Sequence, residues 1–323
     1  MLILAVESSC DEFSVSILKN GKIISNIISS QIEEHAKFGG VIPELAARLH
    51  LENFPHVLKT VFKNTNLSLN EIDYVAYTHE PGLMGSLLIG RLVAKTIAMY
   101  INKPLLQVNH ILGHIYGSNI NNEFVYPVLA LVISGGHTHL QLLNSPLETK
   151  IIGETQDDAI GECYDKVARL LNLSYPGGPK LDRLAAMGDR NIYKLPSPKL
   201  IDHDLNFSYS GLKTAANNLI NNAKQKQEKI NIENFAASFQ YAAIKPLFMK
   251  LKIAINKFNP KTVTIAGGVA ANSEIRKQLF ELKNDYNKLN IIMPDLEYCT
   301  DNAAMIAKYA EQLILLRDKN IDI

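Results

Sequence analysis

Two histidines stand four residues apart in the run 105–114, which reads Leu-Leu-Gln-Val-Asn-His-Ile-Leu-Gly-His. A short apolar segment ends at Asn109, and on a helix that starts there His110 and His114 would lie on the same face. Two imidazole nitrogens so placed can bind a small metal ion. The alternative is an ordinary helix with one buried and one exposed histidine, and the pair alone does not exclude it. Ile111 stands where zinc proteases of the His-Glu-x-x-His type need glutamate, so that chemistry is not expected.

The composition is that of a soluble globular protein with a substantial core. The chain has 323 residues, of which 47% are hydrophobic and 20% charged, enough for one large domain or two lobes. The net charge of +1 generates no general attraction for nucleic acid. Any contacts with phosphates must therefore come from a local patch or from another subunit.

Cysteine usage and hydropathy indicate the compartment. Cys10, Cys163 and Cys299 are odd in number and far apart, which favours a reducing environment over a disulfide framework. The apolar segment 2–6 is too short for a signal peptide, and the sequence pattern predicts no apolar run of membrane-spanning length. We therefore expect a cytoplasmic protein that does not contact a membrane.

An internal duplication is the main architectural signal. Residues 2–28 alternate as strand, polar turn, strand, turn and strand, and residues 128–153 repeat this pattern. The repeat predicts an α/β protein with an N-terminal lobe at 1–125 and a C-terminal lobe at 126–323. The second lobe would carry a helical insertion at about 155–245. The two lobes would close on a central cleft, because ligands of such sheets bind beyond the strand ends.

Two further segments bear on binding and on packing. A predicted strand at 262–266 ends in Gly267-Gly268 and leads to a helix at Asn272, an arrangement that favours an anion or a ribose. In the first lobe the apolar spacing predicts helices at about 44–62, kinked or broken at Pro55, and at 84–100.

Nine longer motifs, taken together, carry a resemblance to a known family. They are ESSCDE (7–12), HAKFGGVIPELAARLH (35–50), SGGHT (134–138), GECYDKVAR (161–169), YPGG (175–178), FSYSGLKT (207–214), AASFQ (236–240), GGVAANS (267–273) and TDNAAMIA (300–307). In this order they resemble the tRNA N6-adenosine threonylcarbamoyltransferase family, long described as O-sialoglycoprotein endopeptidases. The resemblance runs from residue 2 to about residue 310. It implies the two-lobed fold of actin, Hsp70 and sugar kinases, in agreement with the duplication.

The resemblance also implies an activity and a site. The family transfers a threonylcarbamoyl group from threonylcarbamoyl-adenylate to N6 of adenosine 37, in tRNAs that read codons beginning with adenine, and releases AMP. Its motifs assign His110, His114 and Asp301 as ligands of one divalent metal, usually Fe²⁺, with Zn²⁺ as the alternative. Glu12 is a candidate for orienting the substrate or handling a proton. The substrate-binding positions correspond to Val132, Ile133, Ser134, Gly135, Gly136, Asp165, Gly178, Asp182 and Asn272.

Three positions depart from the family pattern. Leu112 replaces a common glutamate between the two histidines, Phe13 replaces threonine and Cys299 replaces serine. Leu112 removes a carboxylate near the metal, which leaves the tuning and identity of the metal open. Cys299 is either an additional soft ligand or a buried small residue.

The resemblance also implies partners. Bacterial members of the family work with a metal-free paralogue and a small ATPase, so we expect a dimer through the two first-lobe helices. Apolar residues recur along both helices: Leu45, Leu49, Val57, Leu58, Val61, Leu87, Leu88, Leu92 and Ile97. Two other functions remain as alternatives, a metalloprotease and a nucleotide-binding scaffold or kinase of the same fold. A kinase would lack the histidine pair, so a measurement of bound metal would distinguish a kinase from the transferase.

Overall fold

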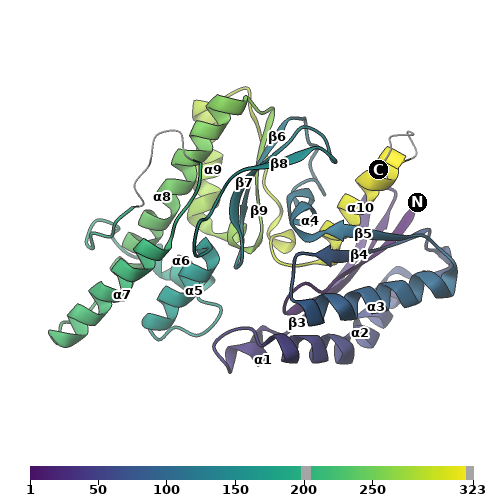
Figure 1. The fold of residues 1–323 in the computed structure, drawn as a ribbon, viewed down its shortest axis with the longest axis horizontal. Helices are drawn as coiled ribbons and strands as arrows, with labels where there is room; N and C mark the ends of the chain where they lie inside the picture. The colour runs from purple at the N-terminus through teal and green to yellow at the C-terminus, as the bar shows by residue number, and fades with distance from the viewer. Residues whose placement is uncertain (198–204, 318–323) are drawn as a thin grey trace. The chain divides into compact units, whose positions relative to one another are not determined.

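The computed structural model describes residues 1–197 and 205–317, and these fall into two compact units. The first unit comprises residues 1–123 together with the segment from Pro294 onward, and the second comprises residues 124–293. The elements of both are labelled in Figure 1.

The first unit is built on a five-stranded sheet in the order β3-β2-β1-β4-β5. Its strands are β1 (Leu2–Glu7), β2 (Glu12–Lys19), β3 (Lys22–Ser30), β4 (Tyr74–Glu80) and β5 (Leu105–Asn109). The strands β1, β2 and β3 pair antiparallel, whereas β1, β4 and β5 run parallel. The carboxyl ends of β1, β4 and β5 therefore meet at one edge, where ligands bind in sheets of this kind.

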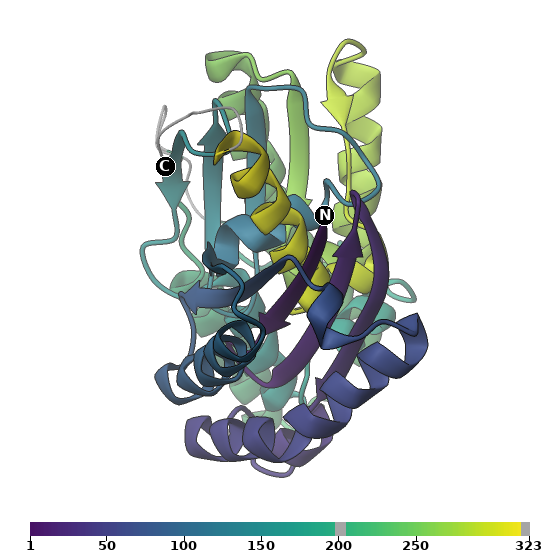
Figure 2. The ribbon, with the colours of Figure 1, turned by 90° about the vertical axis from the view of Figure 1, so that its right-hand side faces the viewer.

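Helices cover this sheet. They are α1 (Ile32–Ala36), α2 (Pro43–Thr65), η1 (Leu69–Glu71), α3 (Met84–Ile101), α4 (His110–Gly117), η3 (Leu296–Tyr298) and α10 (Ala303–Arg317). Figure 2 shows α2 and α3 on the opposite side of the sheet from α10. The helix α2 continues through Pro55 without a break. Pro55 has no backbone N–H to donate to the carbonyl of Leu51. This loss is tolerated because Leu51 is exposed to water.

The second unit repeats this design. Its strands are β6 (Val128–Ile133), β7 (Thr138–Leu143), β8 (Thr149–Glu154), β9 (Thr262–Ala266) and β10 (Asn290–Ile291), in the order β10-β9-β6-β7-β8. As in the first unit, three strands pair antiparallel and three run parallel. The duplication predicted from the sequence is thus confirmed, and with it the fold class. The cleft expected between the units stays a prediction.

The second unit contains helices within the expected insertion and beyond it. They are α5 (Ile160–Leu170), α6 (Gly178–Ala185), α7 (Ser210–Gln225), α8 (Ile232–Phe258), η2 (Gly268–Ala271) and α9 (Ser273–Asp285). Residues 198–204 of the expected insertion, and 318–323 of the expected second lobe, lie outside the described residues. The insertion supplies α5 to α8, which carry several of the predicted substrate-binding positions.

The division of the chain differs from the expected boundary at the C-terminal end. The sequence places all of 126–323 in the second lobe, whereas the segment from Pro294 belongs to the first unit. The reason is the packing of α10, which lies against the first sheet with Ala304 and Ile306 fully buried. The backbone N–H of Ala303 also donates a hydrogen bond of 2.9 Å to the hydroxyl of Ser14 on β2.

The hydropathy of α3 corrects one sequence expectation. This 18-residue helix has a mean hydropathy of 1.4 and is long and apolar enough to cross a membrane by length and composition alone. It nevertheless packs on β4 with Val93, Ala94 and Ile97 in the core of the first unit. A helix that covers a sheet needs such an apolar face, so this is weak evidence for a span.

Candidate metal centre and substrate-binding residues

The histidine pair lies where β5 passes into α4. Asn109 ends the strand and caps the helix, because its side-chain oxygen accepts a hydrogen bond of 3.1 Å from the backbone N–H of Leu112. His110 and His114 are the first and fifth residues of α4, so both rings emerge on one face. The ring centroids are 4.5 Å apart. The local geometry predicted for the pair is therefore present.

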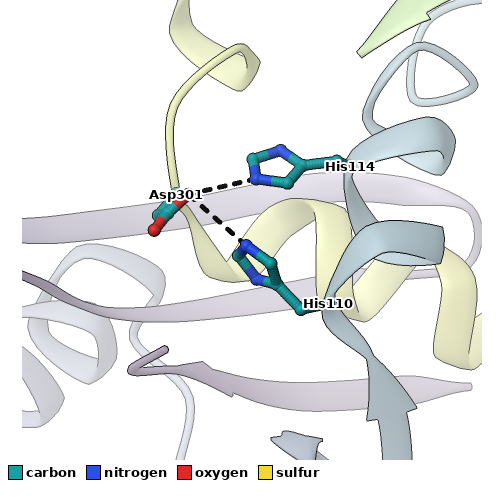
Figure 3. A group of neighbouring side chains, drawn as sticks. All are labelled: His110, His114 and Asp301. Atoms are coloured by element: carbon teal, nitrogen blue, oxygen red, sulfur yellow. Dashed lines mark hydrogen bonds and ion pairs between the residues drawn. The ribbon is translucent and has the colours of Figure 1, made fainter. Parts of the chain in front are cut away.

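Asp301 reaches the same point from the segment that precedes α10. In Figure 3 the two rings of α4 point toward its carboxylate. The Nε2 atom of His114 lies 3.0 Å from Asp301 Oδ1, and the Nε2 atom of His110 lies 3.7 Å from the same oxygen. The structure thus brings the histidine pair together with a residue that lies 187 positions beyond His114 in the chain.

A fourth side chain, Glu7, completes this cluster. It ends β1 as a fully buried residue, and its Oε2 lies 3.3 Å from Nδ1 of His110. Thr78, near the end of β4, donates a hydrogen bond to the same oxygen, and the backbone N–H of Ser9 donates one of 2.6 Å to Oε1. A carboxylate that accepts from Nδ1 leaves Nε2 of His110 directed at the site, as in many histidine metal ligands.

The electrostatics of the cluster favour a positive charge. Burial works to lower the pKa of His110, but the carboxylates of Glu7 and Asp301 outweigh it and raise that pKa to about 9. Burial works to raise the pKa of Asp301, yet His110 and His114 hold it below its usual range. In the same way His110 offsets burial and lowers the pKa of Glu7. A divalent cation would benefit from the same two carboxylates.

The donor set fits a transition metal. One atom from each of His110, His114 and Asp301 lies within 4.8 Å of the others. Two ligands of one ion are at most about 4.2 Å apart, twice a usual metal–ligand distance, so a small adjustment is enough. Two imidazoles and one carboxylate suit Fe²⁺ or Zn²⁺ and leave coordination positions open.

Glu12 begins β2 and is buried. Burial raises the pKa of its carboxyl well above the usual value, and the charges of Asp301, Asp11 and Glu7 add to the effect. A carboxyl in such surroundings can hold a proton near neutral pH.

The three residues that depart from the family pattern all lie in the first unit. Phe13 is fully buried in the core of the first unit, and Leu112 is half-buried on α4. Cys299 is also buried, and its thiol donates to the carbonyl of Asp295 at 3.5 Å. Cys299 therefore occupies the position of a small buried residue.

The predicted substrate-binding residues lie in the second unit. Val132 and Ile133 end β6 and are fully buried, and Ser134, Gly135 and Gly136 form the turn that follows. Space around Gly135 and Gly136 is open, since a Cβ atom on either would meet nothing within 4 Å. The backbone of this turn is thus accessible to a ligand.

Two other glycines hold neighbouring segments against this turn. The strands β6 and β9 are parallel neighbours, so Gly267 follows β9 beside the end of β6. Gly267 has a φ of +92°, and a Cβ atom there would lie 2.4 Å from the carbonyl oxygen of Ile133. A Cβ atom on Gly161, at the start of α5, would lie 2.6 Å from the carbonyl oxygen of Ser134. Only glycine permits both approaches.

Asp165 and Gly178 are direct neighbours. Oδ1 of Asp165 on α5 accepts hydrogen bonds from the backbone N–H groups of Gly177, at 2.7 Å, and of Gly178, at 3.4 Å. The carboxylate therefore fixes the loop 175–178 and the first residue of α6.

Asp182 and Asn272 meet at the start of α9. Asp182 on α6 accepts from the backbone N–H of Ser273 at 2.9 Å and from its hydroxyl at 2.8 Å. Asn272 caps α9, with Oδ1 accepting from the N–H of Ile275 at 3.0 Å. Much of the hydrogen-bonding capacity of Asp182 is thus used within the protein, which the sequence did not indicate.

Sequence reasoning missed three residues of these clusters, namely Glu7, Thr78 and Gln240. Glu7 and Thr78 lie at or near the carboxyl ends of the parallel strands β1 and β4, and His110 directly follows the parallel strand β5. Gln240 lies in the first half of the long helix α8 and ends the motif AASFQ, which carried the resemblance without assigning a role to this residue.

Comparison with known proteins identifies the family of the chain. The family model described as tRNA N6-adenosine threonylcarbamoyltransferase matches residues 22–308. A protein of that name from Mycoplasma capricolum is 61% identical over 319 residues, covering 99% of this chain and 100% of the relative. One from Bacillus subtilis is 47% identical, covering 95% of this chain and 89% of the relative.

Solved structures with low identity support the fold alone. Full-length HypF, in a phosphate- and nucleotide-bound form, aligns with a TM-score of 0.63 at 13% identity, over 97% of this chain and 46% of HypF. Component A of the (R)-2-hydroxyglutaryl-CoA dehydratase of Acidaminococcus fermentans aligns with a TM-score of 0.55 at 15% identity, over 97% of this chain and 99% of its own.

Proposed function

Because the chain belongs to the tRNA N6-adenosine threonylcarbamoyltransferase family, we propose that it transfers a threonylcarbamoyl group from threonylcarbamoyl-adenylate to N6 of adenosine 37. The substrates are tRNAs that read codons beginning with adenine, and AMP is released. The observation that carries this proposal is the match to the family over nearly the whole chain. The clustering of His110, His114 and Asp301 supports it further.

The proposed metal site consists of His110, His114 and Asp301, with Fe²⁺ as the first candidate and Zn²⁺ as the second. When bound there, the metal would supply Lewis acidity for activating the acyl carbonyl. Glu7 holds the ring of His110 through Nδ1, so that Nε2 faces the ion. Glu12, a buried carboxyl with a raised pKa, is our candidate for proton handling.

The proposed binding site for the adenylate consists of Val132, Ile133, Ser134, Gly135, Gly136, Asp165, Gly178, Asp182 and Asn272. Backbone N–H groups of the open turn 134–136 can donate to phosphate or carbonyl oxygens. Asn272 lies at the start of α9, where the helix terminus favours polar or negative groups. Asp165 contributes by shaping the loop at Gly178 as well as through its own oxygens.

The test of the transfer activity is mass analysis of tRNA nucleosides from cells depleted of this protein. We expect N6-threonylcarbamoyladenosine to disappear and to return with the wild-type chain, but not with Asp301→Ala. The purified Asp301→Ala protein should bind metal about tenfold more weakly or worse. Unchanged modification after depletion would refute the function. Full metal occupancy in Asp301→Ala would show that Asp301 is not a metal ligand.

The partners form a second part of the proposal. We propose a dimer through α2 and α3 with a metal-free paralogue, assisted by a small ATPase. Along α3 the residues Met84, Leu88, Leu92 and Met99 are each more than half exposed, at 73%, 53%, 57% and 71%. Their spacing places them on one stripe, whereas Leu87 and Ile97 of the same helix are buried. An exposed apolar stripe of this kind favours packing against helices of another subunit.

Light scattering after size-exclusion chromatography tests the dimer. The double variant Leu88→Asp and Leu92→Asp should reduce complex formation, whereas Leu147→Asp, an exposed leucine of the second unit, should not. The isolated chain should modify tRNA weakly or not at all. A monomer that turns over repeatedly without a partner would refute this part of the proposal.

The location is also a proposal. We place the protein in the cytoplasm, because Cys10, Cys163 and Cys299 form no disulfide, as expected in a reducing compartment.

A further inference from the structure

Gln240 is a buried amide of α8 that contacts side chains from three other elements. It is 6% exposed. Its Oε1 accepts a hydrogen bond of 3.3 Å from the hydroxyl of Tyr164 on α5 and one of 2.9 Å from Nδ2 of Asn272. Its Nε2 donates one of 3.1 Å to Oδ1 of Asp182 on α6. One side chain therefore connects α5, α6 and the start of α9.

The orientation of these amides follows from their partners. A backbone N–H can only donate, so the atom of Asn272 that faces Ile275 must be the oxygen, and Nδ2 must face Gln240. The carboxylate of Asp182 accepts from the N–H of Ser273 and so faces Gln240 as an acceptor. Gln240 must then direct Nε2 at Asp182 and Oε1 at Asn272. No other arrangement satisfies all of these groups.

The network limits what Asn272 can offer to a ligand. Its oxygen is used to cap α9, and one of its two amide hydrogens is directed at Gln240. The second amide hydrogen remains as a donor whose direction is set by the first bond. Without Gln240 the Asn272 side chain would keep the cap but lose the bond that fixes the plane of its amide.

We propose that Gln240 is a positioning residue, which sets the direction of the side-chain amide of Asn272 and of the carboxylate of Asp182 for binding the nucleotide part of the substrate. This inference rests on the proposed function, in which Asn272 and Asp182 bind the adenylate. Gln240 itself acts through these two residues. Gln240 contacts each of them through a single hydrogen bond. Its loss leaves Asp182 bonded to Ser273 and Asn272 bonded to Ile275, but removes the contact that fixes the direction of each side chain.

The consequence is a weaker affinity for the nucleotide. The variant Gln240→Met keeps the length of the side chain and removes every hydrogen bond. By the usual cost of a lost buried hydrogen bond, we expect the Kd for AMP to rise about tenfold. In the complete transfer reaction the KM for the adenylate should rise more than kcat falls, since Gln240 lies outside the metal cluster.

The experiment is a double-mutant cycle on the full chain, with AMP binding measured by calorimetry. It compares the wild type, Gln240→Met, Asn272→Ala and the double variant. If Gln240 acts through Asn272 and Asp182, the loss in the double variant should be smaller than the sum of the two single losses, because the part that acts through Asn272 is already lost in Asn272→Ala. The matched control is Ser238→Ala on the same helix, a buried hydroxyl that accepts from the N–H of Tyr193 and does not contact Asn272. This control should bind AMP as the wild type does.

A second variant covers the case in which Gln240→Met fails to fold. Tyr164→Phe removes only the hydroxyl that donates to Gln240 and leaves the ring packed against Phe239. It should weaken AMP binding about twofold to fivefold, by the loss of one neutral hydrogen bond.

The outcomes are distinct. Weak binding by Gln240→Met and Asn272→Ala, with a less than additive loss in the double variant, supports the inference. Wild-type affinity in Gln240→Met beside weak binding in Asn272→Ala overturns it, as do additive losses, and in either case the proposed function stands. If the wild type itself does not bind AMP, the proposed nucleotide site fails and the inference fails with it.

Discussion

Replacing Glu7 with glutamine tests the electrostatic account of the metal cluster. The two carboxylate oxygens of Glu7 face three groups, the Ser9 N–H, the Thr78 hydroxyl and Nδ1 of His110. A glutamine of the same shape has only one acceptor oxygen. If that oxygen stays with the Ser9 N–H, which can only donate, the amide nitrogen faces Nδ1 of His110.

The expected magnitude follows from the tautomer. An amide N–H donates to Nδ1, so the proton of His110 moves to Nε2, the atom that should bind the metal. The loss of a carboxylate that orients a metal-bound histidine costs about tenfold to a hundredfold in metal affinity. This corresponds to about 1.4–2.7 kcal/mol of binding free energy. The loss of negative charge beside the cation acts in the same direction.

The assay is competition between the protein and a chelator for Zn²⁺, with an anaerobic repeat for Fe²⁺. The matched control is Asp73→Asn, another acid-to-amide change in the first unit, at a carboxylate that is 44% exposed and bonds to the N–H of Leu2. The control should bind metal as the wild type does. Equal metal affinities of Glu7→Gln and the wild type would refute the role assigned to Glu7.

Two further predictions concern the second unit. Asp165→Ala should weaken AMP binding by about 1–3 kcal/mol, because the loop at Gly177 and Gly178 loses its acceptor, while metal content measured by mass spectrometry stays unchanged; loss of metal instead would contradict this. Burial works to raise the pKa of Asp157, but hydrogen bonds from Ser208, Tyr209 and Ser210 lower it overall. Its stabilisation is thus present above the unfolded pKa of about 3.9 and lost as pH falls through the lower folded value. Asp157→Ala should cost about 1 kcal/mol of unfolding free energy at pH 7, since the residue is exposed, and less at pH 3 in urea unfolding. An equal cost at both pH values would contradict the charged role.

Local patterns were sufficient to predict the elements of the fold. The continuous apolar run 128–133 predicted β6 with the bounds that the structure has, and the succession of strands and turns in residues 2–28 predicted β1, β2 and β3 to within a few residues. Periodicity depends only on neighbours in the chain, so a sequence can display it directly. The placement of His110 and His114 on one face of α4 was predictable for the same reason.

Contacts between distant segments were decided by packing. Asp301 reaches His114 because α10 returns to the first sheet, and no local pattern shows which sheet a helix will cover. The resemblance to a family named Asp301, but only the tertiary structure placed it beside the two histidines. The domain boundary at the C-terminal end was misplaced for this reason.

The sequence by itself determined which residues are present, the strands and helices that carry them, and through its motifs the family. The tertiary structure decided how their hydrogen bonds are distributed. Asp182 and Asn272 were identified as substrate-binding positions, yet the structure shows Asp182 holding Ser273 and Asn272 capping α9 beside Gln240. A buried polar group must find partners wherever the fold brings them, and those partners lie on other elements of the chain. Hydrogen-bond partners at long range leave no periodic trace in the sequence, so the roles of Glu7 and Gln240 became visible only in the folded chain.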